Sequence, residues 1–356
     1  MNNSHTAAYL IGPDDLILVT GAAGFMGPRL VRRLLERGFR NLRCLVRPSA
    51  DAARVQALSA LSGNGAQIEF VRGNLLTPAD CEAATKNVAV IYHLAAGRGE
   101  KSVPDAFLNS VVTTRNLLDA TLKHNCLKRF VNVSSFAVYS NRAKAHWRLL
   151  DESCPLESQP ALRGEAYCYA KVKQDEIVDE YRTRFHIPSV TVRPGYVYGP
   201  GNEGITGRVG IDTFGIFLHL GGSNRIPATY VDNCAEAIVL AGLTPGVDGE
   251  VFNVVDDDLP TSRQWLRLYK RRVKRFRSLF VPRFLSYLFC SGWEWYSQRS
   301  HGQLPPAFNR RRWHAYWKKT TYTNAKLKTC LNWTPPVSTS EGLQRYFDAC
   351  RGVRHA

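Results

Sequence analysis

The stretch TGAAGFMG, residues 20–27, decides the fold of this 356-residue chain. It follows the apolar run DLILVT at 15–20 and precedes a stretch of helical period at 28–37. Glycines three residues apart permit a tight turn, a close approach of the backbone to a pyrophosphate, and close packing of helix on strand. A helix N-terminus facing the phosphates completes a dinucleotide site. The residues expected to hold the dinucleotide here are Gly21, Gly24, Phe25, Met26 and Gly27.

Strand and helix patterns continue to alternate up to residue 200. Apolar, β-branched runs occupy 41–47, 67–73, 88–96, 129–135 and 189–199, with helical periods at 52–61, 106–124 and 165–185 between them. This order is typical of a parallel sheet covered on both faces and joined by right-handed crossovers. The sequence therefore predicts an α/β fold: a Rossmann doubly wound parallel sheet with a smaller, mixed C-terminal substrate lobe.

The pattern changes after Gly199 to a glycine-rich loop and short helices. TYVDNCAEAIVLA at 229–241 reads as a helix that returns to the main core, and EVFNVV at 250–255 is one further strand. We expect an N-terminal tail at 1–13, an NAD(P)-binding domain at 14–200 with return elements near 229–256, and a substrate-binding lobe at 201–356.

The positive charge of the chain is confined to its last quarter. Residues 1–258 contain 27 Lys and Arg and 27 Asp and Glu, whereas residues 259–356 contain 20 and 3, which accounts for the net charge of +17. Such asymmetry indicates that the C-terminal region faces a phosphorylated substrate, a membrane surface or nucleic acid. A solvated basic surface is the alternative.

Residues 270–296 run from a basic cluster into an aromatic, apolar stretch. Pro282, Arg283 and Glu294 interrupt it, so it falls short of the roughly 20 apolar residues that a membrane-spanning helix needs. It fits peripheral contact with an anionic membrane, with Lys and Arg at the headgroups. An apolar wall of the substrate pocket or of the core is the alternative.

The nine cysteines are scattered, odd in number and never form a C-x-x-C pair. This distribution indicates reduced thiols in the cytoplasm, with no disulfide framework and no zinc or other metal site. The N-terminus lacks a basic region followed by an apolar core, so we expect no secretory signal. The expected location is cytoplasmic, including a peripheral position on the inner membrane face.

The segment YCYAK, residues 167–171, places Tyr167 and Lys171 on one face of a helix. An ammonium near a phenol favours the phenolate, so we expect a lowered pKa for Tyr167 and a role in proton transfer. Ser134 and Ser135 end the strand at 129–135, at the sheet edge where such folds bind ligands. A hydroxyl, a phenol and an ammonium suit hydride transfer between a nicotinamide and a secondary alcohol or ketone.

The second strand ends at Arg47, with no Asp or Glu to bind the adenosine ribose. A basic residue there can face a 2′-phosphate, which favours NADP over NAD. Arg47 could equally be an exposed strand-end arginine, or could stack on adenine with either cofactor.

The chain resembles the extended short-chain dehydrogenase/reductases, NAD-dependent epimerase/dehydratase type, in six segments that keep the family's order and spacing. These are TGAAGFMG, HLAA at 93–96, VSSFAVY at 133–139, YCYAK, RPGYVYGPG at 193–201 and YVDN at 230–233. The resemblance implies that Tyr167 and Lys171 are the catalytic pair, and that Lys171 also binds the nicotinamide ribose. It implies that Ser135, four residues before Tyr139, is the catalytic hydroxyl and touches the substrate.

The resemblance also implies further cofactor contacts. They are Leu94, Ala95 and Ala96 beside the cofactor, Asn109 near it, Asn74 and Leu75 near the adenine, and Pro194 and Val197 in the loop that closes on the nicotinamide. The family often has Gly-Asp-Leu where this chain has Gly73-Asn74-Leu75. With the acid at the end of the second strand also missing, the choice between NADP and NAD stays open.

Three functions remain open. RPGYVYGPGN and the closing segment at 322–347 look most like the nucleotide-sugar epimerases and dehydratases, in which Arg225 and other basic residues would meet a diphosphate. YVDN and residues 270–296 are similar to the 3β-hydroxysteroid dehydrogenase branch, which implies a sterol, lipid or lipid-linked sugar alcohol. The third is a non-catalytic NAD(P)-binding or RNA-binding regulator.

The basic tail fits nucleic acid, but Ser135, Tyr167 and Lys171 would then have no evident purpose. We therefore expect a small-molecule substrate and not nucleic acid. The resemblance further implies a homodimer that pairs through the helices at 106–124 and 165–185.

Overall fold

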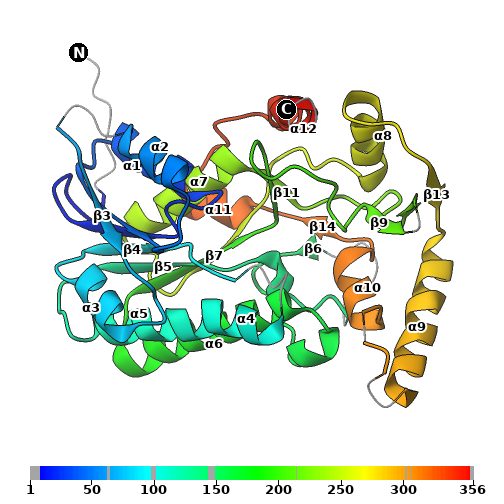
Figure 1. Ribbon diagram of the computed structural model, residues 1–356, viewed down its shortest axis with the longest axis horizontal. Helices are drawn as coiled ribbons and strands as arrows, with labels where there is room; N and C mark the ends of the chain where they lie inside the picture. Colours follow the sequence, from blue (N-terminus) through cyan, green and yellow to red (C-terminus); the bar gives the residue numbers. More distant parts are fainter. Residues whose placement is uncertain are drawn as a thin grey trace.

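The computed structural model describes residues 9–61, 65–97, 102–142, 149–213, 215–300, 303–305 and 307–352. Its centre is a seven-stranded sheet in the order β12-β7-β5-β4-β1-β2-β3, with every neighbouring pair parallel (Figure 1). The strands are β1 (Ile17–Thr20), β2 (Asn41–Val46), β3 (Gln67–Arg72), β4 (Val90–His93), β5 (Arg129–Val133), β7 (Ser189–Pro194) and β12 (Val251–Val254).

The central strands are buried along their whole length. Every residue of β1, β4 and β5 is buried, whereas β3 at the edge alternates between exposed and half-buried residues. Continuous apolar strands are what a parallel sheet requires when helices cover both faces. From β1 the chain winds outward to β2 and β3, then returns to β4 on the other side of β1, so a crevice opens where β1 and β4 end.

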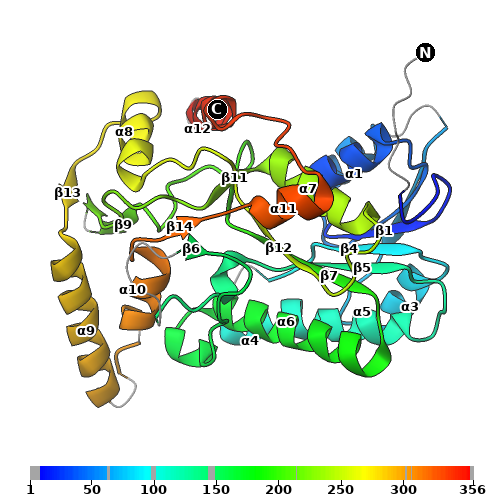
Figure 2. The same cartoon turned by 180° about the vertical axis from the view of Figure 1, so that it is seen from behind.

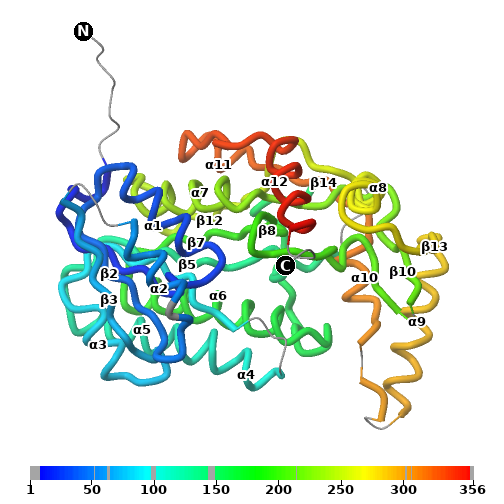
Figure 3. The backbone as a smooth tube through the Cα atoms, turned by 45° about the horizontal axis from the view of Figure 1, so that its top comes forward, coloured from blue at the N-terminus to red at the C-terminus, as the bar shows by residue number. Residues whose placement is uncertain are grey.

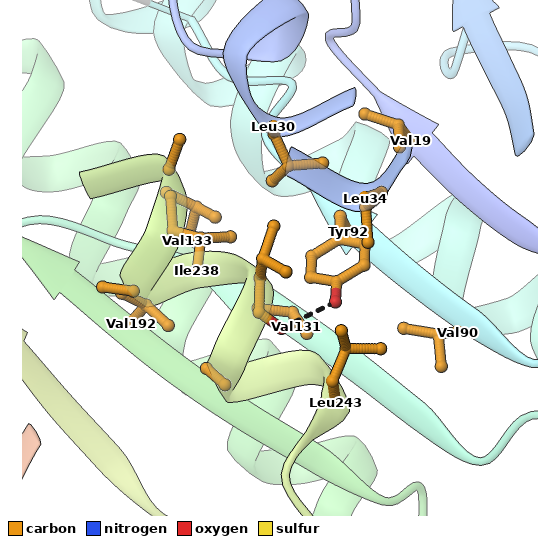
Figure 4. Packing of buried hydrophobic residues seen from close by; sticks show 14 of the residues in the cluster. Val19, Leu30, Leu34, Val90, Tyr92, Val131, Val133, Val192, Ile238 and Leu243 are labelled. Carbon is orange, nitrogen blue, oxygen red and sulfur yellow. Dashed lines mark hydrogen bonds between the residues drawn. The ribbon is translucent and has the colours of Figure 1, made fainter. Parts of the chain in front are cut away.

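Helices cover both faces of the sheet (Figures 1 and 2). One face carries α1 (Gly27–Glu36), α7 (Val231–Leu243) and α11 (Ala325–Leu331); the other carries α3 (Pro78–Thr85), α5 (Thr113–Thr121) and α6 (Ala166–Phe185). Figure 4 shows Tyr92 of β4 between α1 and α7, where its hydroxyl donates to the Val239 carbonyl at 2.9 Å. Leu30, Leu34 and Ile238 pack in the same cluster, so this core fixes α1 behind the glycine turn.

The smaller sheets and the helices of residues 262–316 lie toward one end of the molecule, away from β3 (Figure 3). In a mixed sheet, β10 (Ile216–His219) pairs antiparallel with β9 (Gly210–Thr213) and parallel with β13 (Ser278–Phe280). The two-stranded sheets pair β8 (Tyr196–Tyr198) with β11 (Ala228–Tyr230) and β6 (Leu149–Leu150) with β14 (Thr321–Tyr322). Helices α8 (Ser262–Arg272), α9 (Arg283–Arg299) and α10 (Arg310–Tyr316) complete this region, and α12 (Thr339–Gly352) is the last helix.

The predicted α/β fold, with a doubly wound parallel sheet and a smaller mixed lobe, is confirmed. The predicted helix at 106–124 divides into α4 (Val103–Phe107), a π-helical segment η1 (Leu108–Val112) and α5. The run at 189–199 divides into β7 and β8, which belong to different sheets. Residues 1–8 of the expected tail lie outside the described residues.

Within the residues that the structure describes, no helix is both long and apolar enough to cross a membrane.

Candidate active site

A cleft of about 730 Å³ lies at the carboxyl edge of the sheet. Its walls come from the residues that follow β1, β2, β3, β4 and β5, together with one side of η1 and the start of α6. Most of the residues singled out from the sequence line this cleft: Gly21, Gly24, Phe25, Met26, Gly27, Arg47, Asn74, Leu75, Leu94, Ala95, Ala96, Asn109, Tyr167 and Lys171.

The glycine turn is packed too closely to admit side chains. Gly21 has a φ of +69°, and a Cβ there would lie 2.9 Å from the Ala95 nitrogen. A Cβ at Gly27 would lie 2.1 Å from the Ala22 carbonyl oxygen. Helix α1, all of which is described, has no side-chain hydrogen bond at its N-cap and no acidic residue in its first turn. The positive end of its dipole is thus available to a pyrophosphate, and the turn fits NAD(P).

The segment that runs from the end of β2 into the first turn of the next helix supplies two guanidinium groups to the cleft. Arg47 and Arg54 are both exposed and line it together with Ser49. Asp51, which also lines the cleft, accepts a hydrogen bond from the Ala53 amide and caps α2 (Ala52–Ser59). The sequence analysis missed Arg54. The segment RPSADAAR at 47–54 contains the signal, because it has a second arginine seven residues after Arg47, and the first turn of α2 places that arginine at the cleft.

Two adjacent serines contribute differently to the site. The half-buried Tyr167 side chain is hydrogen-bonded to Ser135. Ser135 also caps a short 3-10 turn, where its Oγ accepts from the Ala137 amide at 3.1 Å. Ser134, by contrast, lines the cleft, and its buried Oγ has no hydrogen-bond partner among the described residues. The cleft therefore holds a hydroxyl that a bound group could satisfy.

Lys171 is 3% exposed, and the protein engages two of the three N–H donors of its ammonium. Its Nζ donates to the Val133 carbonyl at 2.7 Å and to Gln174 Oε1 at 2.9 Å. Burial lowers the pKa of Lys171 to about 8, and the charge of Asp175 acts in the opposite direction. Near neutral pH the side chain is still mostly an ammonium.

The expected lowering of the Tyr167 pKa is not observed. Burial raises the pKa of this phenol, and the hydrogen bond from Ser135 only partly opposes the rise. The expectation rested on Lys171, whose ammonium instead donates to Val133 and Gln174. In this structure Tyr167 therefore carries its proton.

A buried polar network fixes the position of Lys171. Gln174 donates to Asn132 at 2.9 Å, and Asn132 donates to Asp175 at 2.9 Å. Asp175 in turn forms a buried ion pair with Arg193 of β7 at 3.0 Å. These bonds tie α6 to β5 and β7, so the position of Lys171 depends on three elements of the core.

Asn109 lies in the π-helical segment η1, a type of distortion that often marks functional sites. Its amide donates to the backbone and side-chain oxygens of Asp105 at 2.9 and 3.1 Å. The nearby His93 ring is buried between Thr20 and Thr114, with both ring nitrogens 2.8 Å from a hydroxyl. Burial lowers the pKa of His93 to about 3, so the ring is neutral and serves to hold β4 in place.

Comparison with known proteins agrees with this geometry. Residues 17–254 match the model of the NAD dependent epimerase/dehydratase family. The chain belongs to this family. The resemblance to extended short-chain dehydrogenase/reductases is thereby confirmed, as is the expectation of a family of enzymes that use NAD or NADP.

Relatives of this family member include both reductases and sugar-nucleotide enzymes. A Ginkgo biloba protein named as an anthocyanidin reductase is 31% identical over 198 residues, which cover 53% of this chain and 57% of the relative. A Bacillus subtilis protein named as a UDP-glucose epimerase is 27% identical over 252 residues, covering 67% of this chain and 76% of that protein. The match spans only a little over half the length of the reductase-type relatives.

Among solved structures, UDP-glucuronic acid 4-epimerase from Bacillus cereus, in complex with UDP-glucuronic acid and NAD, superposes with a TM-score of 0.70. The sequences are 23% identical, and the match covers 95% of this chain and 99% of the epimerase. At this identity the likeness shows the fold, including the smaller lobe.

Four of the expected site residues do not line the cleft of this epimerase/dehydratase family member. Ser135 is hydrogen-bonded to Tyr167, and Tyr167 lines the cleft. Pro194 lies on β7 and Val197 on β8. The segment that follows them lines the cleft with Asn202, whose side-chain amide donates to the Val197 carbonyl at 2.8 Å. Arg225 is exposed and donates to the Leu259 carbonyl at 3.2 Å. Their roles remain predictions.

Proposed function

We propose that this protein transfers hydride, through NAD(P), at a secondary alcohol or ketone of a nucleotide sugar. One observation carries the proposal: Tyr167 and Lys171 lie in the same cleft as the glycine turn of α1. Proton-transfer and dinucleotide-binding groups thus line one cleft. The full-length likeness to a UDP-sugar epimerase supports a sugar nucleotide as substrate.

Bound NAD(P) would supply the hydride acceptor and donor. The glycine turn and α1 would hold its pyrophosphate, and Lys171, fixed by Val133 and Gln174, would orient its ribose. Tyr167 would exchange a proton with the substrate oxygen, steadied by its hydrogen bond to Ser135. Ser134, with its free hydroxyl, would donate to the ligand from the cleft wall. A phosphate-binding role for Arg225 and the division of the chain near residue 200 belong to the same proposal.

The alternative is a 3β-hydroxysteroid-dehydrogenase-like reaction on a sterol, lipid or lipid-linked sugar alcohol. The observation that favours it is the large exposed apolar face of α9. This face would hold the enzyme at a membrane that contains such an alcohol, and the substrate would then need no diphosphate.

We also propose NADP as the preferred cofactor, because Arg47 and Ser49, which follow β2, and Arg54 of α2 all line the cleft. Replacing Arg47 by Ala should then weaken NADP binding about tenfold or more, since hydrogen bonds to charged groups contribute roughly 1.5–3 kcal/mol, and should leave NAD binding nearly unchanged. Titration calorimetry with both cofactors measures the difference. Arg40→Ala, at the opposite end of the same strand, is the control; equal weakening of NAD and NADP by Arg47→Ala would exclude recognition of the 2′-phosphate.

The test of function begins with the purified protein. It is denatured, and any released nucleotide is identified by mass spectrometry. Stoichiometric NAD would indicate a cofactor regenerated in each turnover, as in an epimerase or dehydratase, and would overturn the preference for NADP. An empty protein that binds added NADPH indicates a dissociable co-substrate and net reduction. Incubation with UDP- and dTDP-sugars, followed by product analysis, completes the test; turnover of sterol or lipid alcohols alone would refute the nucleotide-sugar proposal.

A cytoplasmic homodimer completes the proposal. All nine cysteines are free thiols, which supports a reducing compartment. Leu108, Leu122 and Phe185 are exposed on η1, at the end of α5 and at the end of α6, and support pairing through these helices. Light scattering on wild type and on Leu122→Arg tests the dimer.

A further inference from the structure

Most of the large apolar residues of helix α9 are exposed to water. The buried residues of α9 are Ser286, Cys290 and Ser297, which are small and mostly polar. Its exposed residues recur at helical spacing on the opposite face and are large: Phe284, Leu285, Leu288, Phe289, Trp295 and Tyr296. Phe284 is 65% exposed and Leu288 61%. A surface helix normally turns such residues toward the core.

The buried side of α9 is satisfied by specific contacts, so the orientation of the helix is well determined. Ser286 Oγ accepts from the Trp313 indole of α10 at 2.9 Å, and Ser297 Oγ donates to the Leu304 carbonyl at 2.7 Å. Rotating the helix to bury its aromatic residues would break both bonds. The outward apolar face is therefore a consequence of how α9 packs on α10.

Strand β13 extends the same surface. Leu279 is 60% exposed and Phe280 47%, immediately before α9 begins. Eight of the 16 large hydrophobic side chains that are exposed in the described part of the chain lie within residues 279–296. Concentrated apolar surface of this kind marks an interaction site, because isolated exposed residues are ordinary and clusters are not.

The surroundings of this surface are strongly cationic. Residues 263–299 contain ten Lys and Arg and one acid, Glu294, and that acid is paired with Arg310 at 2.8 Å. The exposed cations that precede the apolar residues include Lys274, Arg275 and Arg277. At the far end of α9, the Arg299 guanidinium lies 4.1 Å from the centre of the Trp295 ring. Positive charge thus flanks the apolar face at both ends.

We propose that residues 274–299, comprising β13 and α9, form a docking surface for an anionic lipid membrane. Aromatic and aliphatic side chains would enter the boundary between headgroups and acyl chains, with Trp295 and Tyr296 at the level that such residues prefer. The flanking Lys and Arg would meet the anionic headgroups. With 17 residues, α9 lies along the surface rather than through it.

A membrane fits this surface better than a second copy of the chain. A symmetric pair would bring the same cationic patch against itself, because both subunits of such a dimer use the same surface. An anionic membrane instead complements the charge. The surface is also separate from the chemistry, since no residue of 274–299 lines the cleft.

Flotation of the full-length protein with vesicles tests the proposal. Vesicles of phosphatidylcholine alone are compared with vesicles that also contain phosphatidylglycerol, at low and high salt. We expect wild type to bind the anionic vesicles, and to bind them less at high salt. Phe284→Ser/Leu288→Ser should lower that binding about tenfold or more, as should Lys274→Glu/Arg275→Glu/Arg277→Glu.

The matched control is Val103→Ser/Leu162→Ser, which removes two exposed apolar side chains (48% and 59%) from other elements and should bind as wild type does. Circular dichroism confirms that each variant is folded. Absence of wild-type binding, equal binding to neutral vesicles, or equal loss in the control would overturn the proposal. Loss of self-association in Phe284→Ser/Leu288→Ser, without any vesicle binding by wild type, would identify the surface as an interface between copies.

Discussion

Helices α6 and α9 break the usual amphipathic pattern in opposite directions. Helix α6 buries charged and polar side chains, Lys171, Gln174 and Asp175, against the central sheet. Helix α9 buries two serines and a cysteine and exposes four of its six aromatic residues. Each exception costs free energy of folding, either by desolvating charge or by leaving apolar area in water.

The two exceptions differ in how the structure compensates them. In α6 every buried polar group named above has a partner within the protein, so these hydrogen bonds and the ion pair offset the cost of burial. In α9 the exposed apolar area has no such compensation among the described residues, and a partner outside the chain would provide it. Departures from the usual amphipathic pattern thus occur in both helices, α6 and α9, that we connect with function.

The largest effect is expected at Tyr167 of α6. Tyr167→Phe keeps the ring and removes the hydroxyl, so turnover should fall by about 10²–10⁴-fold, the usual contribution of general acid–base catalysis. Cofactor affinity should stay within about twofold of wild type, since the ring remains in the cleft wall. Steady-state kinetics and cofactor titration measure the two quantities. Tyr169→Phe, two residues along the same helix, is the control, and an unchanged rate in Tyr167→Phe would remove this residue from the mechanism.

The buried ion pair in α6 should dominate its stability. Asp175→Ala leaves the Arg193 guanidinium buried without its carboxylate, so the free energy of unfolding should fall by about 3–5 kcal/mol. Asp179→Ala removes the exposed Arg182 pair on the same helix and should cost less than about 1 kcal/mol. Urea unfolding of both variants measures the contrast. Similar losses would mean that burial does not distinguish the two pairs.

Lys171 should make stability depend on pH. Its pKa of about 8 in the folded protein lies below the unfolded value of 10.5, so the unfolded state binds more protons between these values. The contribution of Lys171 to the free energy of unfolding should therefore rise from about pH 8 to pH 10.5. The difference between wild type and Lys171→Met, measured by urea unfolding across this range, isolates it. A difference that stays flat between pH 8 and pH 10.5 would contradict the lowered pKa of Lys171.

The smallest effect is expected on the exposed face of α9. Leu288→Ser should change the free energy of unfolding by no more than about 0.5 kcal/mol, because the side chain is already in water. The corresponding change in α6, Ile177→Ser, replaces a buried side chain and should cost about 2–5 kcal/mol. Thermal and urea unfolding compare them. A large loss in Leu288→Ser would show that α9 buries this face in solution.

Most of the central fold could be predicted because its signals are local. Short β-branched runs, helical periods and the glycine turn each depend on residues close together in the chain. The errors arose where distant residues intervene. The run at 189–199 divides at Gly195, where a Cβ would lie 2.0 Å from the Pro227 carbonyl oxygen, a contact that no local pattern reveals.

The candidate site was also predicted in part, where local signals were sufficient. Spacing and resemblance were enough to identify the glycine turn, Asn109, Tyr167 and Lys171 as residues of one cleft. They missed Arg54, and they could not foresee that Ser134, rather than Ser135, would line the cleft wall. Both depend on how a loop turns after its strand.

By itself, the sequence determined the order of the central strands along the chain, the dinucleotide turn and the family to which the chain belongs. Only the tertiary structure decided that the Lys171 ammonium is held by Val133 and Gln174, that burial raises the pKa of Tyr167, and that the apolar face of α9 points outward. The physical reason is that periodicity shows that a helix has two different faces, whereas burial, hydrogen bonding and pKa depend on neighbours that the chain brings from far away.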